Sequence, residues 1–238
     1  MTRGKTILFG VLTVIASSVC VRLGLWQLDR LEQRRAQNAI VAARGAAAPL
    51  TVAALRGQDT SVTHWRRVRV DAVADYAREL VHATRSQNGS PGVHLLTPVR
   101  PLDGSWGDTA ILVLRGYLYA ADGRTVNFEQ ARETDTLHFE TVLTSFPPIK
   151  AGQARMQSSP RAMRLLNPDT IGTLIGRPVA PFVLLALGDT IMKDITRPTR
   201  VPPPTLDEGP HLSYALQWFS FATVFVVGFV AFARSKRR

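Results

Sequence analysis

Residues 212–233 read LSYALQWFSFATVFVVGFVAFA and contain no charged side chain. About 20 apolar residues are enough for a helix to cross the roughly 30 Å of hydrocarbon in a bilayer. A second apolar stretch, residues 6–25, contains Arg22 as its only charge. Because Arg22 stands near the end of that stretch, its long side chain can reach the phosphate level. The sequence therefore predicts two transmembrane helices, at residues 6–28 and 211–233.

The chain has a formal net charge of +11, most of which lies beside these two stretches. Residues 1–37 contain six basic and two acidic side chains, and residues 209–238 contain four basic and no acidic ones. Residues 38–208 are nearly balanced, with nineteen basic and sixteen acidic side chains and no basic run interleaved with aromatic residues. We therefore expect membrane lipid, and no nucleic acid, as the neighbour of this charge.

The basic residues also predict the orientation, since they concentrate on the cytoplasmic side of membrane proteins. Four of them directly follow the second apolar stretch, whereas Asp207 and Glu208 precede it. Both termini are then expected in the cytoplasm and the middle of the chain outside it. Arg30, Arg34 and Arg35 depart from this rule, because they follow the first stretch on the outer side, and they suggest an anionic partner.

The short N-terminus bears on the type of membrane. Only five residues precede the first apolar stretch, so no organelle presequence is visible, and we expect a bacterial cytoplasmic (inner) membrane. A cleavable signal peptide is the alternative, but the apolar run is longer than a signal core and lacks a small-x-small cleavage site. Cys20 is the only cysteine and is expected to be an apolar filler within the first helix.

Residues 38–208 have the pattern of one extracytoplasmic, mainly-β (α+β) domain. Segments rich in β-branched and aromatic residues alternate with Gly, Pro, Asp and Asn. The expected strands are residues 65–73, 79–84, 92–100, 109–119, 137–146 and 180–187. One helix is expected at 167–174, with Asn167 as its cap and Pro168 in its first position. Residues 31–43 should continue the first membrane helix, and residues 197–204 should approach the second in an extended, polyproline-like form.

Motifs that would indicate an enzyme are absent from the sequence. There is no HExxH, GxSxG, GxxxxGK[ST] or strand-associated GxGxxG pattern. With a single cysteine and no pair of histidines at helical spacing, a closed zinc or copper site is not expected. We therefore predict that the protein is not an enzyme. The alternative is an extracytoplasmic enzyme whose catalytic residues meet from distant strands, in which case residues 38–208 alone would keep the activity.

The most informative residues lie where the two apolar stretches reach the outer surface. The first stretch leaves the membrane through residues 23–30, LGLWQLDR, and the second enters it through residues 211–219, HLSYALQWF. An aromatic belt at the membrane border accounts for Trp26, Tyr214 and Trp218. It does not account for His211 or Gln217.

These border residues form two stripes on the second helix. At about 100° per residue, Ser213, Gln217 and Ser220 share a polar stripe, which we expect to pack against the first helix, with Gln27 bonding across. The other stripe combines His211 with flat rings and small residues. Its members are His211, Tyr214, Ala215, Trp218, Ala222 and Phe225. Such a face could hold haem, with Arg30 or Arg22 near the propionates; alternatively, His211 is a hydrogen-bonded residue of the belt.

The two border motifs, residues 23–30 and 211–219, resemble the surfeit locus protein one family, which comprises cytochrome c oxidase assembly factors. The similarity extends to Thr97-Pro98 and Arg115-Gly116-Tyr117 and to the order of span, β domain and span. The chain departs from the family at Leu114 and Tyr117, where Asn and Trp are usual, and at Pro210, where Asn commonly precedes the histidine. The resemblance implies maturation of the catalytic subunit of a haem-copper oxidase.

It further implies that haem a is bound through His211, with oxidase subunit I and haem a synthase as partners. Tyr214 and Trp218 would then form walls and Arg30 would pair with a propionate, while Trp26 and Gln27 would fix the angle between the helices. The alternative is a membrane-anchored scaffold for subunit I that never binds haem.

Overall fold

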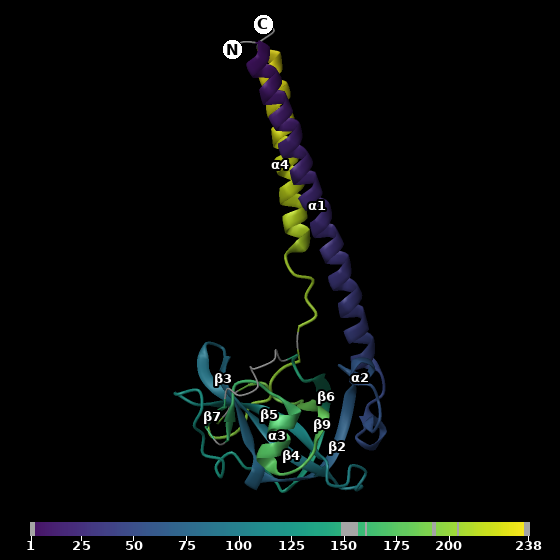
Figure 1. Cartoon of the computed structure of the whole chain (residues 1–238), viewed down its shortest axis with the longest axis vertical. Helices are drawn as coiled ribbons and strands as arrows, with labels where there is room; N and C mark the ends of the chain where they lie inside the picture. Colours follow the sequence, from purple (N-terminus) through teal and green to yellow (C-terminus); the bar gives the residue numbers. More distant parts are fainter. Residues whose placement is uncertain (1–2, 149–156, 160, 192–193, 204, 236–238) are drawn as a thin grey trace. The chain divides into compact units, whose positions relative to one another are not determined.

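The computed structural model describes residues 3–148, 157–159, 161–191, 194–203 and 205–235. The chain divides into two compact units. One unit joins Met1–Ala42 to Thr205–Arg238, and the other comprises Ala43–Pro204. Figure 1 shows the long helices of the first unit and the strands of the second.

The first unit contains most of α1 (Arg3–Ala46) and all of α4 (His211–Ser235). Both helices are long and apolar enough to cross a membrane, with mean hydropathies of 2.0 and 1.9 in their most apolar windows. The prediction that the first helix continues through residues 31–43 is confirmed, since α1 runs unbroken to Ala46. The predicted boundaries of the membrane-crossing segments remain predictions.

The helices α1 and α4 lie side by side (Figure 1), and small residues set their packing. A Cβ atom added to Gly24 would lie 2.5 Å from Cε1 of Phe219, and one added to Gly10 would lie 3.0 Å from Cζ of Phe229. Ala215 and Ala222 of α4 are buried. Small side chains let helix backbones approach closely, which is how helices associate within a membrane. Cys20 is buried in α1, as predicted.

The second unit is built on a β-sheet. Its described strands are β1 (Leu50–Thr51), β2 (Arg67–Ala74), β3 (Leu80–Gln87), β4 (Ser90–Pro101), β5 (Ala110–Tyr119), β6 (Thr136–Ser145), β7 (Gln157–Ser159), β8 (Ala162–Met163) and β9 (Val179–Ala186). Their order in the sheet is β1-β2-β6-β9-β5-β4-β3-β8-β7, and β2 also pairs with β4. That extra pairing closes β2, β6, β9, β5 and β4 into a small barrel. The short helical segments are η1 (Ala53–Leu55), α2 (Thr60–Thr63), η2 (Tyr76–Arg78) and α3 (Pro168–Ile175).

The barrel is filled by apolar side chains that alternate along the strands. Val68, Val70 and Ala72 of β2 are fully buried, and the intervening Arg69 and Asp71 are exposed. This period of two is the pattern of a strand with one face toward a core. On the outside of the barrel, α3 covers the sheet with Ile171 and Ile175.

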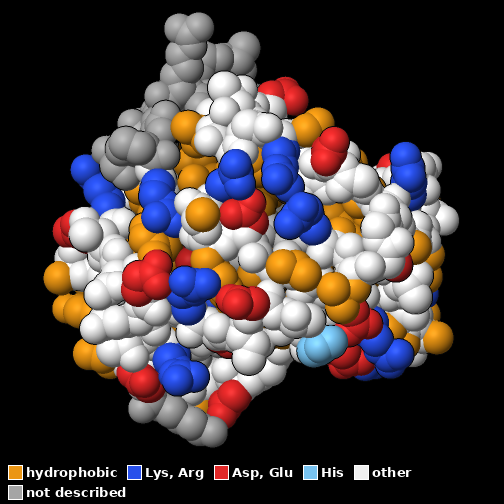
Figure 2. Space-filling model, turned by 90° about the horizontal axis from the view of Figure 1, so that it is seen from below, with side chains coloured by type: hydrophobic (Ala, Val, Ile, Leu, Met, Phe, Trp, Pro, Cys, Tyr) orange, Lys and Arg blue, Asp and Glu red, His pale blue; other side chains and the backbone are white. Residues whose placement is uncertain are grey.

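Most elements of the β unit were predicted from local patterns. The six expected strands correspond to β2, β3, β4, β5, β6 and β9, and the expected helix corresponds to α3, capped by Asn167 with Pro168 in its first turn. The strands β1, β7 and β8 were missed, because each has only two or three residues. The predicted extended segment 197–204 includes Thr199, which bridges to Tyr117 of β5; residue 204 lies outside the described residues. On the face shown in Figure 2, basic and acidic side chains are mixed.

Candidate functional site

His211, the first residue of α4, contacts α1 directly. Its Nδ1 lies 2.9 Å from Oε1 of Gln27. Because an amide oxygen can only accept a hydrogen bond, Nδ1 carries the proton and the lone pair of the neutral ring is on Nε2. Among the described residues, Nε2 has no hydrogen-bond partner. An imidazole whose Nδ1–H is held by an oxygen while Nε2 is free has the usual arrangement of a metal ligand.

The predicted choice of helix faces is wrong. The small residues of the histidine face pack against α1: Ala215 and Ala222 are buried, and the backbone oxygen of Ala222 lies 3.5 Å from Oγ of Ser17, whereas Tyr214 and Phe225 are exposed. The polar stripe, Ser213, Gln217 and Ser220, is exposed in the described structure. The reason is that the two alanines allow α1 and α4 to approach, whereas the glutamine would hold them apart. Gln27 does bond across the helices, but to His211.

The remaining predicted residues lie around the same border. Tyr214 and Trp26 are each 47% exposed. The ring of Trp218 meets Phe221 edge-on, with centroids 5.9 Å apart. Arg30 lies over the indole of Trp26, its guanidinium carbon 5.8 Å from the ring centroid. The structure thus brings His211 to Gln27 and Arg30 to Trp26, and it records no hydrogen bond or ring pairing between the imidazole and Tyr214 or Trp218.

Two of the arginines that depart from the positive-inside rule have acidic partners. Nε and Nη2 of Arg35 each donate to one carboxylate oxygen of Glu208, both at 2.8 Å. Nε of Arg34 donates to the backbone oxygen of Asp207 at 3.1 Å. The hydrogen bond from Arg35 lowers the pKa of Glu208. These contacts hold the segment before α4 against the extension of α1, and they supply the anionic partner that the sequence suggested.

An apolar groove also follows the helix pair. It encloses about 460 Å³ and is lined by residues that include Thr6, Gly10 and Phe229. Gly10 is seventeen residues from Gln27, or about 25 Å at the rise of an α-helix. The groove is therefore a feature of the opposite end of the helices, not part of the His211 site.

The β unit contains a buried ionic network that sequence reasoning missed. Arg115 is fully buried, and its Nη2 donates to Oε1 of Glu79 at 2.6 Å and its Nη1 to Oε2 of Glu133 at 2.9 Å. Arg115 is the extra residue of a bulge in β5, since Leu114 pairs with Leu96 and Gly116 with Leu95. A bulge redirects one side chain, and here it turns a charged one into the interior. Sequence reasoning missed Arg115 because no local residue pattern indicates this shift in the register between β4 and β5.

The charges within this network depend on one another. Burial raises the pKa of Glu79, and Arg115 and a hydrogen bond from Thr97 act against this. Burial also opposes the charge of Arg115, but Glu79 and Glu133 outweigh it, so the pKa of Arg115 is raised. Oε2 of Glu79 is buried and has no hydrogen-bond partner in the described structure. Removing Arg115 would thus leave a buried carboxylate with little compensation.

Gly116, the next residue, is required by close backbone contact. Tyr117 and Thr199 exchange backbone hydrogen bonds of 2.7 and 2.8 Å. A Cβ atom on Gly116 would overlap the carbonyl of Thr199. The motif Arg115-Gly116-Tyr117 therefore has a structural role. Its arginine points into the interior, and its glycine leaves room for the backbone at Thr199, in the segment that leads to α4.

A metal cluster made only of protein ligands is not found in the described part of the chain, where no three His, Cys, Asp or Glu side chains gather. Among the described residues, His211 therefore has no set of protein ligands around it, whereas the iron of a haem is held largely by the porphyrin itself.

Comparison with known proteins identifies the relatives of this architecture. The model of the SURF1 (surfeit locus protein one) family matches residues 14–223, which include both border motifs and the whole β unit. The chain belongs to the SURF1 family. It is similar to the SURF1-like protein of Rickettsia conorii, with 24% identity over 94% of this chain and 90% of the relative. The SURF1-like protein of Rickettsia felis is 23% identical over 94% of this chain and 96% of the relative. Membership in the SURF1 family confirms the resemblance drawn from residues 23–30 and 211–219.

Proposed function

We propose that this SURF1 family protein is a membrane-anchored assembly factor for haem-copper cytochrome c oxidase, which holds haem a at the outer membrane border and helps to deliver it to subunit I. Family membership supports the assembly role, and the His211–Gln27 contact supports the binding of haem. The protein would form and break no covalent bond of its own, so it is not an enzyme in this proposal. Haem a synthase is the partner expected to supply the cofactor.

The proposed location is a bacterial cytoplasmic membrane, with both termini in the cytoplasm and residues 38–208 outside it. Two apolar helices and the basic residues after α4 support this topology. The pairing of Arg34 and Arg35 with Asp207 and Glu208 is consistent with it, because neutralised arginines are weaker topological signals.

The residues at the border fit a haem by their donor chemistry. His211 offers Nε2 as an axial ligand, while Gln27 holds Nδ1 and with it the orientation of the ring. Tyr214 and Trp218 lie on the same helix as candidate walls, and Arg30 carries a guanidinium with no acidic partner among the described residues, suitable for a propionate. The haem would supply the iron and an extended apolar ring. The protein's part would be to bind, orient and release it.

The His211–Gln27 hydrogen bond is the observation that carries the proposal, and it can be tested by colour. The full-length chain is purified from cells that make haem a, and its visible spectrum is recorded beside those of His211→Ala and His211→Gln. We expect a haem spectrum only in the wild type. A matched control is His138→Ala, which removes an exposed histidine of the β unit and should leave the spectrum unchanged.

A scaffold that never binds haem is the second candidate, and one observation favours it. The histidine face packs on α1, so the imidazole could serve only to join the helices. His211→Gln separates the two functions, because an amide can still bond to Gln27 but is a poor iron ligand. Normal oxidase assembly in this variant, together with a colourless wild type, would leave the scaffold as the function. Loss of assembly in a folded His211→Gln variant supports the role of haem.

A further inference from the structure

Two histidines of the β unit face each other on neighbouring strands. His82 of β3 pairs with His94 of β4, and their ring centroids are 6.1 Å apart. Tyr117 of β5 lies opposite His94 on the same face, with ring centroids 6.5 Å apart. Nε2 of His82 is 3.2 Å from the backbone oxygen of Arg164, so it donates and leaves Nδ1 unprotonated. His94 has no hydrogen-bond partner among the described residues.

A strained bulge brings an arginine to this face. The register of β3 and β4 shifts between His82 and Arg85, so that Arg85 pairs with Gly92. Without the extra residue, Arg85 would point to the opposite face; with it, Arg85 follows His82 on the same one. The shift is made by Thr84, a β-branched residue with a φ of 58°, whose backbone N–H bonds to the oxygen of Gly123 at 2.8 Å. Such conformations cost free energy and concentrate at functional sites.

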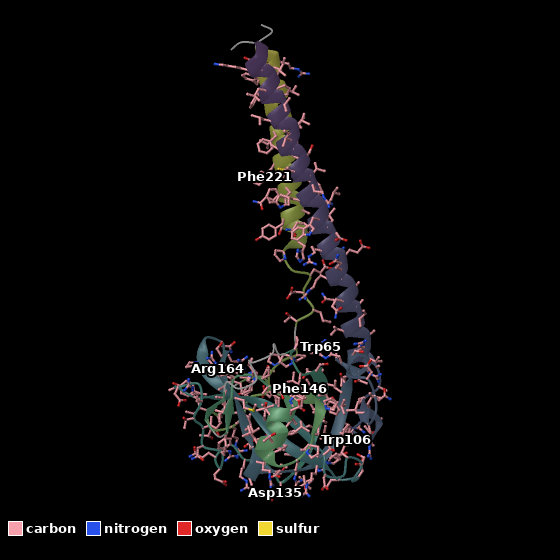
Figure 3. All side chains as sticks on the ribbon, in the orientation of Figure 1. Trp65, Trp106, Asp135, Phe146, Arg164 and Phe221 are labelled. Atoms are coloured by element: carbon pink, nitrogen blue, oxygen red, sulfur yellow. The ribbon has the colours of Figure 1, made fainter. Side chains whose placement is uncertain are left out.

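A second arginine comes from the neighbouring strand. Met163 of β8 pairs with His82, and Arg164 follows it directly beside β3 (Figure 3). The two guanidinium groups act on each other: burial lowers the pKa of Arg85, and the charge of Arg164 lowers it further. Neither arginine has a carboxylate partner among the described residues. By contrast, Arg115 and Arg200 of the same unit are both paired with Glu133.

The chemistry of this group favours an anion over a metal cation. A cation between the imidazoles would be repelled by the charges of Arg85 and Arg164, which have no carboxylate partner in the described part of the chain. An anion would instead be attracted by both guanidinium groups and could accept the ring N–H of neutral His94, whereas the N–H of His82 is already donated to the backbone oxygen of Arg164. Burial first, and then Arg85, lowers the pKa of His82 and of His94 to about 4, so both rings are neutral near pH 7. Two guanidinium groups and the ring N–H of His94 offer more donors than the two oxygens of a carboxylate can use, and they suit a tetrahedral oxyanion.

We propose that Arg85, His94 and Arg164 form a binding site for a phosphate-class oxyanion on the β3–β4 face of the β unit, with His82 holding the backbone of Arg164 beside it. The bulge at Thr84 would serve to place Arg85 within it. The phosphate could be a free anion or the headgroup of a phospholipid, since both present the same oxygens. The site is independent of His211 and of any haem.

Inorganic phosphate is the probe for this site. It is titrated into the full-length chain in detergent at constant ionic strength, and the histidine ring signals are followed by NMR. We expect saturable shifts of the His82 and His94 signals. Arg85→Gln and Arg164→Gln should each weaken binding by about tenfold, as expected for the loss of one charged hydrogen-bond donor. Arg100→Gln is the matched control, because Arg100 is an exposed arginine at the other end of β4.

Each outcome decides the proposal. Shifts that do not saturate, or equal affinities in Arg164→Gln, Arg100→Gln and the wild type, would overturn it. Should Arg85→Gln fail to fold, the exposed Arg164 still gives the test. Titrations in nanodiscs then identify the source of the phosphate group. If a phospholipid headgroup occupies the site, the apparent affinity for inorganic phosphate should be weaker in nanodiscs of phosphatidylglycerol than in nanodiscs of phosphatidylcholine. Equal affinities in the two lipids indicate that the site takes the free anion.

Discussion

Replacement of Arg115 by Met should strongly destabilise the β unit. Arg115 is fully buried, and it donates hydrogen bonds to Glu79, Thr97, Glu133 and the backbone oxygen of Ala131. Met fills a similar volume but leaves the carboxylate of Glu79 buried without its counter-charge. Breaking a buried ion pair in this way costs about 3–5 kcal/mol. For a unit of this size, 1 kcal/mol corresponds to about 2–4 °C in Tm, so we expect a fall of about 6–20 °C.

The assay is thermal unfolding of the full-length protein in detergent, followed by near-UV circular dichroism. Trp106 reports on the β unit, since its ring packs on Phe182 with centroids 5.5 Å apart. The double variant Glu79→Gln/Arg115→Met removes the orphaned charge and should recover part of the loss. A Tm of Arg115→Met within 2 °C of the wild type, or a double variant less stable than Arg115→Met, would refute the reasoning.

The same variant should acquire a characteristic pH dependence. Burial already raises the pKa of Glu79, and Arg115 opposes this; without Arg115, the pKa should rise further. A carboxyl whose pKa is higher in the folded state than in the unfolded state is most favourable below its unfolded value, and that contribution is lost as the pH rises through the folded pKa. Arg115→Met should therefore be more stable relative to the wild type at pH 5 than at pH 8. The opposite trend would show that Glu79 is not the group left uncompensated.

Three further substitutions test the packing. Gly24→Leu places a side chain against an aromatic ring of α4, so it should push the two helices apart. Disulfide cross-linking between cysteines introduced at positions 17 and 222 should then fall by about fivefold. Gly228→Leu is the control and should leave the cross-linking unchanged, because a Cβ atom at Gly228 has nothing within 4 Å. Gly116→Ala should displace the segment that bridges to β5 and lower the Tm of the β unit by several degrees; Gly45→Ala, in open space, is its control. Asn167→Ala removes the cap of α3 and should cost about 1 kcal/mol, measured as a Tm shift of about 2–4 °C. Unchanged values in any of these variants would contradict the packing described.

The sequence was sufficient to predict an element wherever neighbouring residues of that element carried the pattern. Strand β2 shows its period of two in Val68, Val70 and Ala72, and α3 shows its cap and its proline. The apolar runs that became α1 and α4 are likewise continuous in sequence. The pairing of β2 with β4 that closes the barrel joins residues that are 25 to 29 positions apart, and no residue pattern indicates it. The two bulges, at Arg115 and before Arg85, were hidden for the same reason: they are properties of the register between strands.

At the candidate site, the sequence identified the residues but not their arrangement. Amphipathicity distinguished two stripes on α4, yet it could not decide which stripe faces α1, because polar contacts and small side chains both favour helix association. In the structure, the alanines of α4 are the residues buried against α1, and this arrangement places Gln27 next to His211. The residues proposed to bind a phosphate were not singled out, since an arginine in a strand gives no sign of which face it will occupy.

The contacts around the membrane border explain why one particular glutamine meets one particular histidine. Gln27 and Arg35 are eight residues apart on α1, or about 12 Å along its axis, while their partners His211 and Glu208 are only three residues apart. Residues 205–208 are not helical, and a turn at Gly209 and Pro210 leads from Glu208 into α4. A shift of the helices by one turn, about 5.4 Å, would break both contacts together. The ion pair and the His211–Gln27 hydrogen bond thus favour the same register of the helices, so a residue outside the apolar region contributes to the orientation of the proposed ligand.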